Sequence, residues 1–162
     1  MKKVTIIDYG LSNLLSVQHA FAHFGAENLV TGKAEDVLAA DALVLPGVGA
    51  FKDGMAGLEK LGLIEPIRQK AAAGTPLLGI CLGMQMLFDE SEEFGLHKGL
   101  GLIPGRVVRI PSTGPPAKGT AYQLGPAEPG GRTHRFCRHR AGRGNARRGV
   151  LFHPQLRGEA RR

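Results

Sequence analysis

Apolar runs of strand length alternate with segments of helical periodicity through residues 1–110, and this alternation restricts the fold more than any other feature. Strands are expected at residues 3–8, 28–30, 42–45, 75–80 and 101–110. Helices are expected at residues 13–24, 34–40, 55–74 (broken near Gly62) and 82–93. Strands that alternate with helices predict an α/β fold, namely a doubly wound, mostly parallel sheet with helices on both faces.

The first helix carries its own boundary signals. Ser12 or Asn13 suits the N-cap position, because a short polar side chain there accepts hydrogen bonds from backbone N–H groups of the first turn. Gly25 suits the position just past the last turn. The apolar face of this helix is expected at Leu14, Val17, Phe21 and Phe24.

Ligands of doubly wound sheets bind at the carboxyl ends of the strands. Here those ends are Asp8, residues 46–49 and Cys81. Cys81 stands between two glycines in the segment GICLG, residues 79–83, directly after a predicted strand. This is the form of a nucleophile elbow with cysteine in place of serine, in which the glycines relieve crowding around a sharp strand-to-helix turn.

Such a turn exposes the nucleophile at a helix N-terminus, which favours the thiolate and offers backbone N–H groups to an oxyanion. The N–H of Leu82 is one such donor, and the loop of residues 46–49 is expected to supply a second. This arrangement suits acyl transfer through a cysteine thioester. The alternative is that Cys81 is a small apolar residue packed at a strand end, as free cysteines often are.

Length and composition favour a cytoplasmic protein without disulfides. The 162 residues suffice for one domain with its own core. No apolar run approaches the roughly 18 residues needed to cross a membrane, and the N-terminal apolar stretch is too short for a signal peptide. The two cysteines, Cys81 and Cys137, are far apart in a chain with no predicted export signal, which argues against a disulfide.

The net charge of +7 originates in the last part of the chain. Residues 119–162 contain ten arginines and two glutamates but neither lysine nor aspartate, whereas residues 1–118 are almost neutral. Nucleic-acid-binding proteins carry basic arms, but the absence of lysine and of apolar periodicity argues against that partner here. We therefore divide the chain into a globular part, residues 1–118, and an Arg/Gly/Pro-rich tail, residues 119–162.

Three motifs, in this order, resemble one enzyme family. IIDYGLSNLLSVQHAF at residues 6–21, PGVGAF at residues 46–51 and GICLGMQMLF at residues 79–88 are closely similar to class I (triad) glutamine amidotransferases. The first motif is most similar to the glutaminase subunits of imidazole glycerol phosphate synthase. The resemblance covers residues 1 to about 111 and supports Cys81 as a nucleophile.

The resemblance implies that L-glutamine is hydrolysed through a thioester on Cys81, with no metal and no cofactor. It implies that the ammonia passes to a (β/α)8-barrel cyclase subunit, in a heterodimer of histidine biosynthesis. It also implies that the loop of residues 9–13 faces the cyclase. The implied oxyanion and glutamine-binding positions are Gly47, Val48, Gly49, Leu82 and Gln85.

The end of the chain departs from the family. The family continues with PHxGWN and YFxHSY segments, which are absent here, and with FHPE, which supplies a catalytic His–Glu pair. Residues 152–155 read FHPQ, so Gln155 stands where a glutamate would orient His153. A neutral amide cannot stabilise an imidazolium as a carboxylate does.

A shifted reading frame accounts for the missing segments. GTAYQLG, residues 119–125, can be encoded by DNA that reads Val-Pro-His-Ile-Asn-Trp one nucleotide further on. VLFHPQLRGEA, residues 150–160, can be encoded by DNA that reads Cys-Tyr-Phe-Ile-His-Ser-Tyr-Val-Ala-Lys in the same shifted frame. We therefore predict that the tail is out of frame and irregular from about residue 119, that His153 is a coincidence, and that catalysis is impaired.

Two other functions stay open at this point. One is a non-catalytic fragment whose cationic tail binds nucleic acid or the cyclase. The other is a different triad amidotransferase, one that serves anthranilate or pyridoxal phosphate synthesis. The first motif favours the histidine pathway over these.

Other candidate sites are weaker. His19 and His23 lie one helical turn apart but lack a third metal ligand, and the cluster of His134, Cys137 and His139 falls in the tail. The acidic residues 89–95 are expected in a solvated loop, because negative charge is unfavourable at a helix C-terminus.

Overall fold

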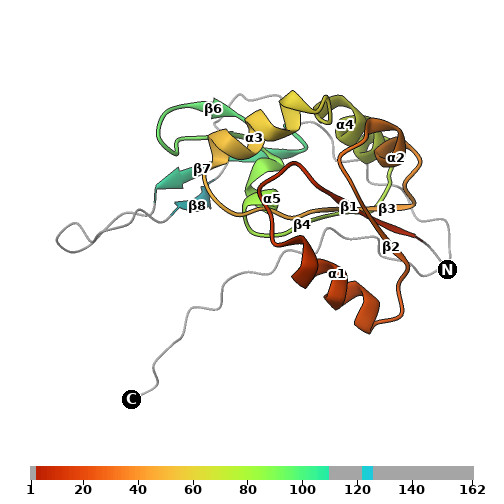
Figure 1. Ribbon diagram of the computed structural model, residues 1–162. Coiled ribbons are helices and arrows are strands. Elements are labelled where there is room, and N and C mark those ends of the chain that lie inside the picture. The colour runs from red at the N-terminus through yellow and green to blue at the C-terminus, as the bar shows by residue number, and fades with distance from the viewer. Residues whose placement is uncertain (1–2, 110–121, 126–162) are drawn as a thin grey trace, which may run out of the picture.

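The computed structural model describes residues 3–109 and the backbone of residues 122–125. Four parallel strands form the central sheet in the order β2-β1-β3-β4 (Figure 1). They are β1 (Val4–Ile7), β2 (Asn28–Thr31), β3 (Ala42–Leu45) and β4 (Leu77–Gly79). The parallel order confirms the predicted fold class and brings the carboxyl ends of all four strands to one edge of the sheet.

Helices cover both faces of this sheet, as the alternation predicts. α1 (Leu14–His23) lies on one face, whereas α2 (Ala34–Leu38), α3 (Phe51–Lys60) and α4 (Ile64–Ala72) lie on the other (Figure 1). The expected break after α3 occurs at Gly62, whose φ of 65° is a left-handed conformation that glycine adopts without strain. The sheet is therefore doubly wound.

α1 begins and ends where the sequence predicts. The Asn13 side chain accepts a hydrogen bond from the Ser16 N–H at 3.3 Å and so caps the helix. At the other end Gly25, with a φ of 70°, donates to the Ala22 carbonyl at 2.9 Å. The apolar face of α1 packs less than expected. None of the residues of α1 is buried, and Phe24, which follows the helix, is 85% exposed.

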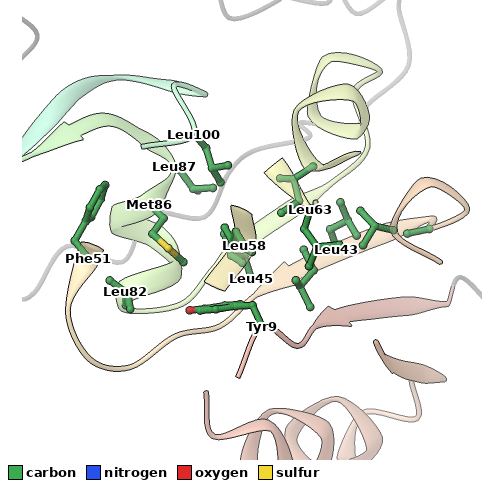
Figure 2. Close-up of a cluster of buried hydrophobic side chains, with 14 of the residues drawn as sticks. Tyr9, Leu43, Leu45, Phe51, Leu58, Leu63, Leu82, Met86, Leu87 and Leu100 are labelled. Carbon is green, nitrogen blue, oxygen red and sulfur yellow. The ribbon is translucent and has the colours of Figure 1, made fainter. Parts of the chain in front are cut away.

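The core lies between the central sheet and the layer of α2, α3 and α4 (Figure 2). Leu58, Leu63 and Ile67 are wholly buried there against β1 and β3. A fully buried side chain of this size contributes about 1.5–3 kcal/mol relative to an exposed one. The same apolar cluster continues beyond the central sheet through Phe51, Met86, Leu87 and Leu100.

The segment after Cys81 differs from the prediction. The helix expected over residues 82–93 ends at Met86 as α5 (Leu82–Met86), and Phe88–Ser91 forms the strand β5. Phe88 and Ser91 are buried, while Asp89 is exposed. The helical prediction is wrong here because pairing with strands later in the chain outweighs the local preference for a helix.

β5 belongs to a second sheet with the order β6-β5-β7-β8. β6 (His97–Lys98) is antiparallel to β5, and β7 (Ile103–Arg109) is parallel to it. Arg106 of β7 lies 3.1 Å from the Glu90 carboxylate and 3.2 Å from the Glu92 carboxylate. Part of the acidic segment is therefore a strand beside a cation and not the solvated loop that we expected.

β8 (Tyr122–Gly125) pairs with β7 in antiparallel register, with Arg109 opposite Tyr122. These four residues belong to the tail, so this short part of it is a strand. The rest of the tail lies outside the described residues, and its reading-frame origin and the boundary near residue 118 stay predictions. In residues 3–109 and 122–125, no helix has the length and apolar character needed to cross a membrane.

Candidate active site at Cys81

Cys81 lies exposed at the turn between β4 and α5. Its backbone has a φ of 53° and a ψ of −116°. A positive φ costs a residue with a side chain about 1–3 kcal/mol, and it persists only where the surrounding structure enforces it. The structure thus confirms the strained strand-to-helix turn that the sequence predicts.

The glycines on either side of Cys81 are sterically required. A Cβ on Gly79 would lie 2.6 Å from the Met84 Cα, and a Cβ on Gly83 would collide with the Leu45 carbonyl oxygen at the end of β3. Because these neighbours are backbone atoms, no side-chain rotation relieves the overlap. The two glycines therefore allow α5 to begin directly against β3 and β4.

The first turn of α5 leaves a backbone donor open beside the thiol. The N–H groups of Met84 and Gln85 donate to the Cys81 carbonyl at 3.0 and 3.2 Å. The Leu82 N–H, in contrast, has no acceptor within the residues that the structure describes. It is therefore available as a hydrogen-bond donor to a bound group.

The loop of residues 46–49 lies directly against the start of α5. The Cβ position of Gly47 is 3.1 Å from the Leu82 Cβ and 3.2 Å from the Gly83 nitrogen. The Val48 N–H donates to the Leu11 carbonyl at 3.0 Å, so in this conformation it is not available to an oxyanion. The Gly47 N–H has no acceptor in the described ranges. The Leu82 amide is thus unbonded at the turn of the nucleophile, and the Gly47 amide is unbonded in the buried part of the loop that packs against this turn.

Two further predicted residues lie beside this arrangement. Gly49 has a φ of 99°, a conformation that favours glycine, and it precedes the first turn of α3. Gln85 is half-buried, one helical turn beyond Cys81 on α5. The role of Gly49 in the oxyanion loop and the role of Gln85 in binding glutamine stay predictions.

Tyr9, which the sequence analysis did not select as a site residue, anchors the start of this loop. Its side chain is only 5% exposed, and its Oη donates to the Pro46 carbonyl at 2.8 Å. Burial, and secondly the nearby Cys81, raise the pKa of the phenol far above its ordinary value, so the hydroxyl stays protonated. Nothing in the local pattern reveals this contact, because it joins positions 37 residues apart.

Glu93 anchors the other end of the loop. Its Oε2 accepts from the Phe51 N–H at 2.7 Å, at the first residue of α3. A carboxylate there satisfies an open donor and interacts favourably with the positive end of the helix dipole. The Ser91 hydroxyl accepts from the Glu93 N–H at 3.1 Å and holds the residue in place. Glu93 thus caps a helix from a segment that the sequence analysis treated as a solvated loop.

The alternative metal positions form no cluster in the described residues. His19 and His23 are both exposed on α1. Within the described ranges, no group of three His, Cys, Asp or Glu side chains is arranged to hold a metal ion. The other metal candidates, His134, Cys137 and His139, lie outside these ranges, as does His153, which was considered as a catalytic base.

Comparisons with known proteins agree with this geometry. A family model of the glutamine amidotransferase class-I family matches residues 5–148. Imidazole glycerol phosphate synthase subunit HisH 1 of Legionella pneumophila (strain Lens) is 58% identical over 114 residues, which are 70% of this chain and 54% of the relative. Subunit HisH of Geobacter sulfurreducens is 53% identical over 111 residues, which are 68% of this chain and 53% of the relative.

A solved structure described as a glutamine amidotransferase superposes with a TM-score of 0.57 at 22% identity. The match covers 65% of this chain and 56% of that one, and at this identity it supports the fold. The chain spans about half the length of the curated relatives it matches. The family model, however, covers most of the chain, including all three motifs and the turn at Cys81. The chain belongs to the class-I glutamine amidotransferase family.

Proposed function

We propose that this chain hydrolyses L-glutamine to glutamate and ammonia through a thioester on Cys81. The observation that carries the proposal is the strained turn that exposes Cys81 beside the unbonded N–H of Leu82, with the loop of residues 46–49 packed against the same turn. The identity of 53–58% to proteins named HisH supports glutamine as the substrate. It also favours the histidine pathway over those of anthranilate and pyridoxal phosphate.

The reaction begins when the Cys81 thiolate attacks the side-chain carboxamide carbon of glutamine. A C–S bond forms and the carbonyl oxygen becomes an oxyanion, which we assign to the Leu82 N–H and to a backbone N–H of the loop of residues 47–49. The intermediate then breaks its C–N bond and releases ammonia once the nitrogen has gained a proton. Water hydrolyses the thioester and restores the thiol. Gln85 is assigned to glutamine binding, and Gly47, Val48 and Gly49 to the oxyanion loop.

Proton transfer is the step that we expect to be weak. A positioned acid–base group typically contributes about 10²–10⁴-fold to such a step. The family's FHPE segment reads FHPQ here at residues 152–155, which lie outside the described residues. On the prediction of an out-of-frame tail His153 is a coincidence, and even a well-placed His153 would lack a carboxylate, because the amide of Gln155 supplies no negative charge. We therefore propose that Cys81 is acylated more readily than the chain turns over.

The proposed partner is the (β/α)8-barrel cyclase subunit, which takes up the ammonia in the cytoplasm. The HisH relatives are named as subunits of imidazole glycerol phosphate synthase, which supports a heterodimer. The loop of residues 9–13, which the resemblance assigns to the cyclase interface, also contacts the loop at the site, since Leu11 accepts from Val48. A partner bound to residues 9–13 would therefore contact a loop that is hydrogen-bonded directly to residues 46–49.

The first test is chemical labelling of the purified chain with 6-diazo-5-oxo-L-norleucine, a glutamine analogue that alkylates thiols. Mass spectrometry should find one label per chain on Cys81, and excess L-glutamine should slow its attachment. Cys81→Ala should abolish the labelling, whereas Cys137→Ala, which removes the other cysteine, should not change it. Equal labelling of both cysteines, without protection by glutamine, would favour a non-catalytic fragment.

The second test measures glutamate release in the presence of the cyclase and its nucleotide ligand. We expect release to be slow even when the label reacts readily with Cys81. Robust release that is lost in both Cys81→Ala and His153→Ala would show that the tail supplies the catalytic base. The prediction of an out-of-frame tail would then be wrong.

A further inference from the structure

A cavity of about 360 Å³ opens at the carboxyl end of β1. Its lining comes from the residues that follow β1, from the residue that follows β2 and from the last turn of α3. Cys81 is not part of the lining, and it follows β4, two strands further along the central sheet. The volume lies at the lower end of the range of ligand pockets, which suits a small molecule.

The cavity occupies the position at which doubly wound sheets bind their ligands. α1 follows β1 on one face of the central sheet, and α3 follows β3 on the opposite face (Figure 1). Because β1 and β3 are neighbours, their connections leave the carboxyl edge in opposite directions, and a crevice forms between them. The turn at Cys81 lies beyond this crevice. The fold therefore offers a second position for a ligand.

Glycines leave the cavity open while its walls pack closely. A Cβ on Gly32 would lie 2.8 Å from the Asp8 carbonyl oxygen, and a Cβ on Gly57 would lie 2.8 Å from the Tyr9 carbonyl oxygen. Larger residues would therefore push β2 and α3 away from the end of β1. No atom lies within 4 Å of a Cβ built on Gly10, so this part of the lining faces open space.

Two side chains of opposite charge line the cavity without pairing. The Asp8 Oδ1 accepts from the Gly10 N–H at 3.0 Å, while its Oδ2 has no partner among the described residues. Lys60 forms no ion pair with any side chain that the structure describes. Leu61, which is 42% exposed, adds an apolar surface next to Lys60. A ligand with a cationic group, an anionic group and an apolar body would find a counterpart for each.

We propose that this cavity binds a small zwitterion with an apolar body, the chemical class of the free α-amino acids. The ligand's ammonium group donates to the Asp8 Oδ2, its carboxylate accepts from the Lys60 Nζ, and its side chain lies against Leu61. Charge-assisted hydrogen bonds of this kind are the strong ones and orient the ligand. The site uses no thioester chemistry and goes beyond the function proposed for Cys81.

The test is a titration of the ¹⁵N-labelled full chain, followed by two-dimensional NMR. The probe is L-norleucine, which carries both charges and an apolar side chain but no carboxamide that Cys81 could attack. N-acetyl-L-norleucine lacks the cation, and L-norleucinamide lacks the anion. We expect saturable shifts of the Gly10 and Gly32 amide signals with L-norleucine and no shift of Gly83, which follows the turn at Cys81.

Four variants assign the two charges. Asp8→Asn keeps an acceptor for the Gly10 N–H, and Lys60→Gln changes an exposed residue, so both should fold as judged by circular dichroism. The matched controls are Asp53→Asn and Lys52→Gln, the same changes at exposed positions in the first turn of α3, outside the cavity lining. Each cavity variant, and each probe that lacks one charge, should raise the Kd by about tenfold, because a hydrogen bond to a charged group is lost. The control variants should bind as wild type.

Three results would overturn the proposal. They are a titration of the wild-type chain without saturable shifts, shifts confined to the residues around Cys81, and a Kd that neither Asp8→Asn nor Lys60→Gln changes. Equal binding of the three probes would exclude a zwitterion as the ligand class. None of these results bears on the labelling of Cys81, so the proposed function is tested separately.

Discussion

Replacing Gly83 by alanine should destabilise the fold more than any alanine substitution at a glycine in open space. A Cβ at this position would lie 2.6 Å from the Leu45 carbonyl carbon and 3.2 Å from the Pro46 carbonyl carbon, and closer still to the Leu45 oxygen. All three atoms belong to the backbone at the end of β3. Either α5 or β3 must therefore move to accept the methyl group.

The expected magnitude follows from two opposing effects. Overpacking of a tight site costs about 1–3 kcal/mol and occasionally more, and a clash with immobile backbone belongs at the upper end of this range. Alanine in place of glycine within a helix recovers up to about 1 kcal/mol. We therefore expect Gly83→Ala to lower the free energy of unfolding by about 2 kcal/mol or more.

Gly62→Ala is the matched control. No atom lies within 4 Å of a Cβ built on Gly62, and its φ of 65° is the only obstacle. Such a left-handed residue costs about 1–2 kcal/mol when it carries a side chain. The expected losses of stability for Gly83→Ala and Gly62→Ala adjoin at about 2 kcal/mol, so stability alone does not separate the two variants. The rate of Cys81 acylation is therefore measured as well. It should fall in Gly83→Ala, which moves the strained turn, and remain unchanged in Gly62→Ala.

Urea unfolding followed by circular dichroism measures both variants, with the midpoint and the slope reported separately. A Gly83→Ala variant that is as stable as wild type and is acylated at the same rate would refute the steric argument. It would mean that α5 does not start as close to β3 as the structure places it.

Three further outcomes are expected. Above about pH 10 the wild-type chain should lose stability relative to Tyr9→Phe, by up to about 1.4 kcal/mol per pH unit. The reason is that the Tyr9 phenol ionises there in the unfolded chain but not in the folded one, where its pKa is raised. Urea titrations from pH 8 to 11 measure this, and a free energy of unfolding that depends on pH equally in both proteins would contradict it. Asn13→Ala should weaken α1 by about 1 kcal/mol and speed hydrogen exchange within it. It should have little effect on global unfolding, because no residue of α1 is buried. A loss of this whole amount from the free energy of global unfolding would argue against this. Glu93→Ala should lower the free energy of unfolding by about 1 kcal/mol, because the Phe51 N–H loses its acceptor. Glu93→Gln keeps an acceptor and should lower it less. Equal losses for the two variants in urea unfolding would mean that the hydrogen bond to Phe51 is not the cause.

The alternation of strands and helices, the caps of α1 and the turn at Cys81 are all readable from local sequence. Asn13 and Gly25 act on backbone groups within their own helix, so their position along the chain is enough to predict their roles. The pair Gly79 and Gly83 marks a crowded turn because glycine alone leaves the space that such a turn needs. The motif resemblance added the chemistry, since spacing alone also permits a buried structural cysteine.

The contacts that complete the site were decided by the tertiary structure. Tyr9 meets Pro46 across 37 positions because β1 and β3 pair in parallel and end at the same edge of the central sheet. Glu93 meets Phe51 across 42 positions because the fold places the segment after β5, a strand of the second sheet, beside the start of α3. The strand at Phe88–Ser91 likewise depends on a partner strand later in the chain, and no local pattern distinguishes it from a continuing helix. Local sterics and helix capping depend on neighbours within a few residues. Buried hydrogen bonds and sheet pairing depend on which distant segments the whole fold places side by side.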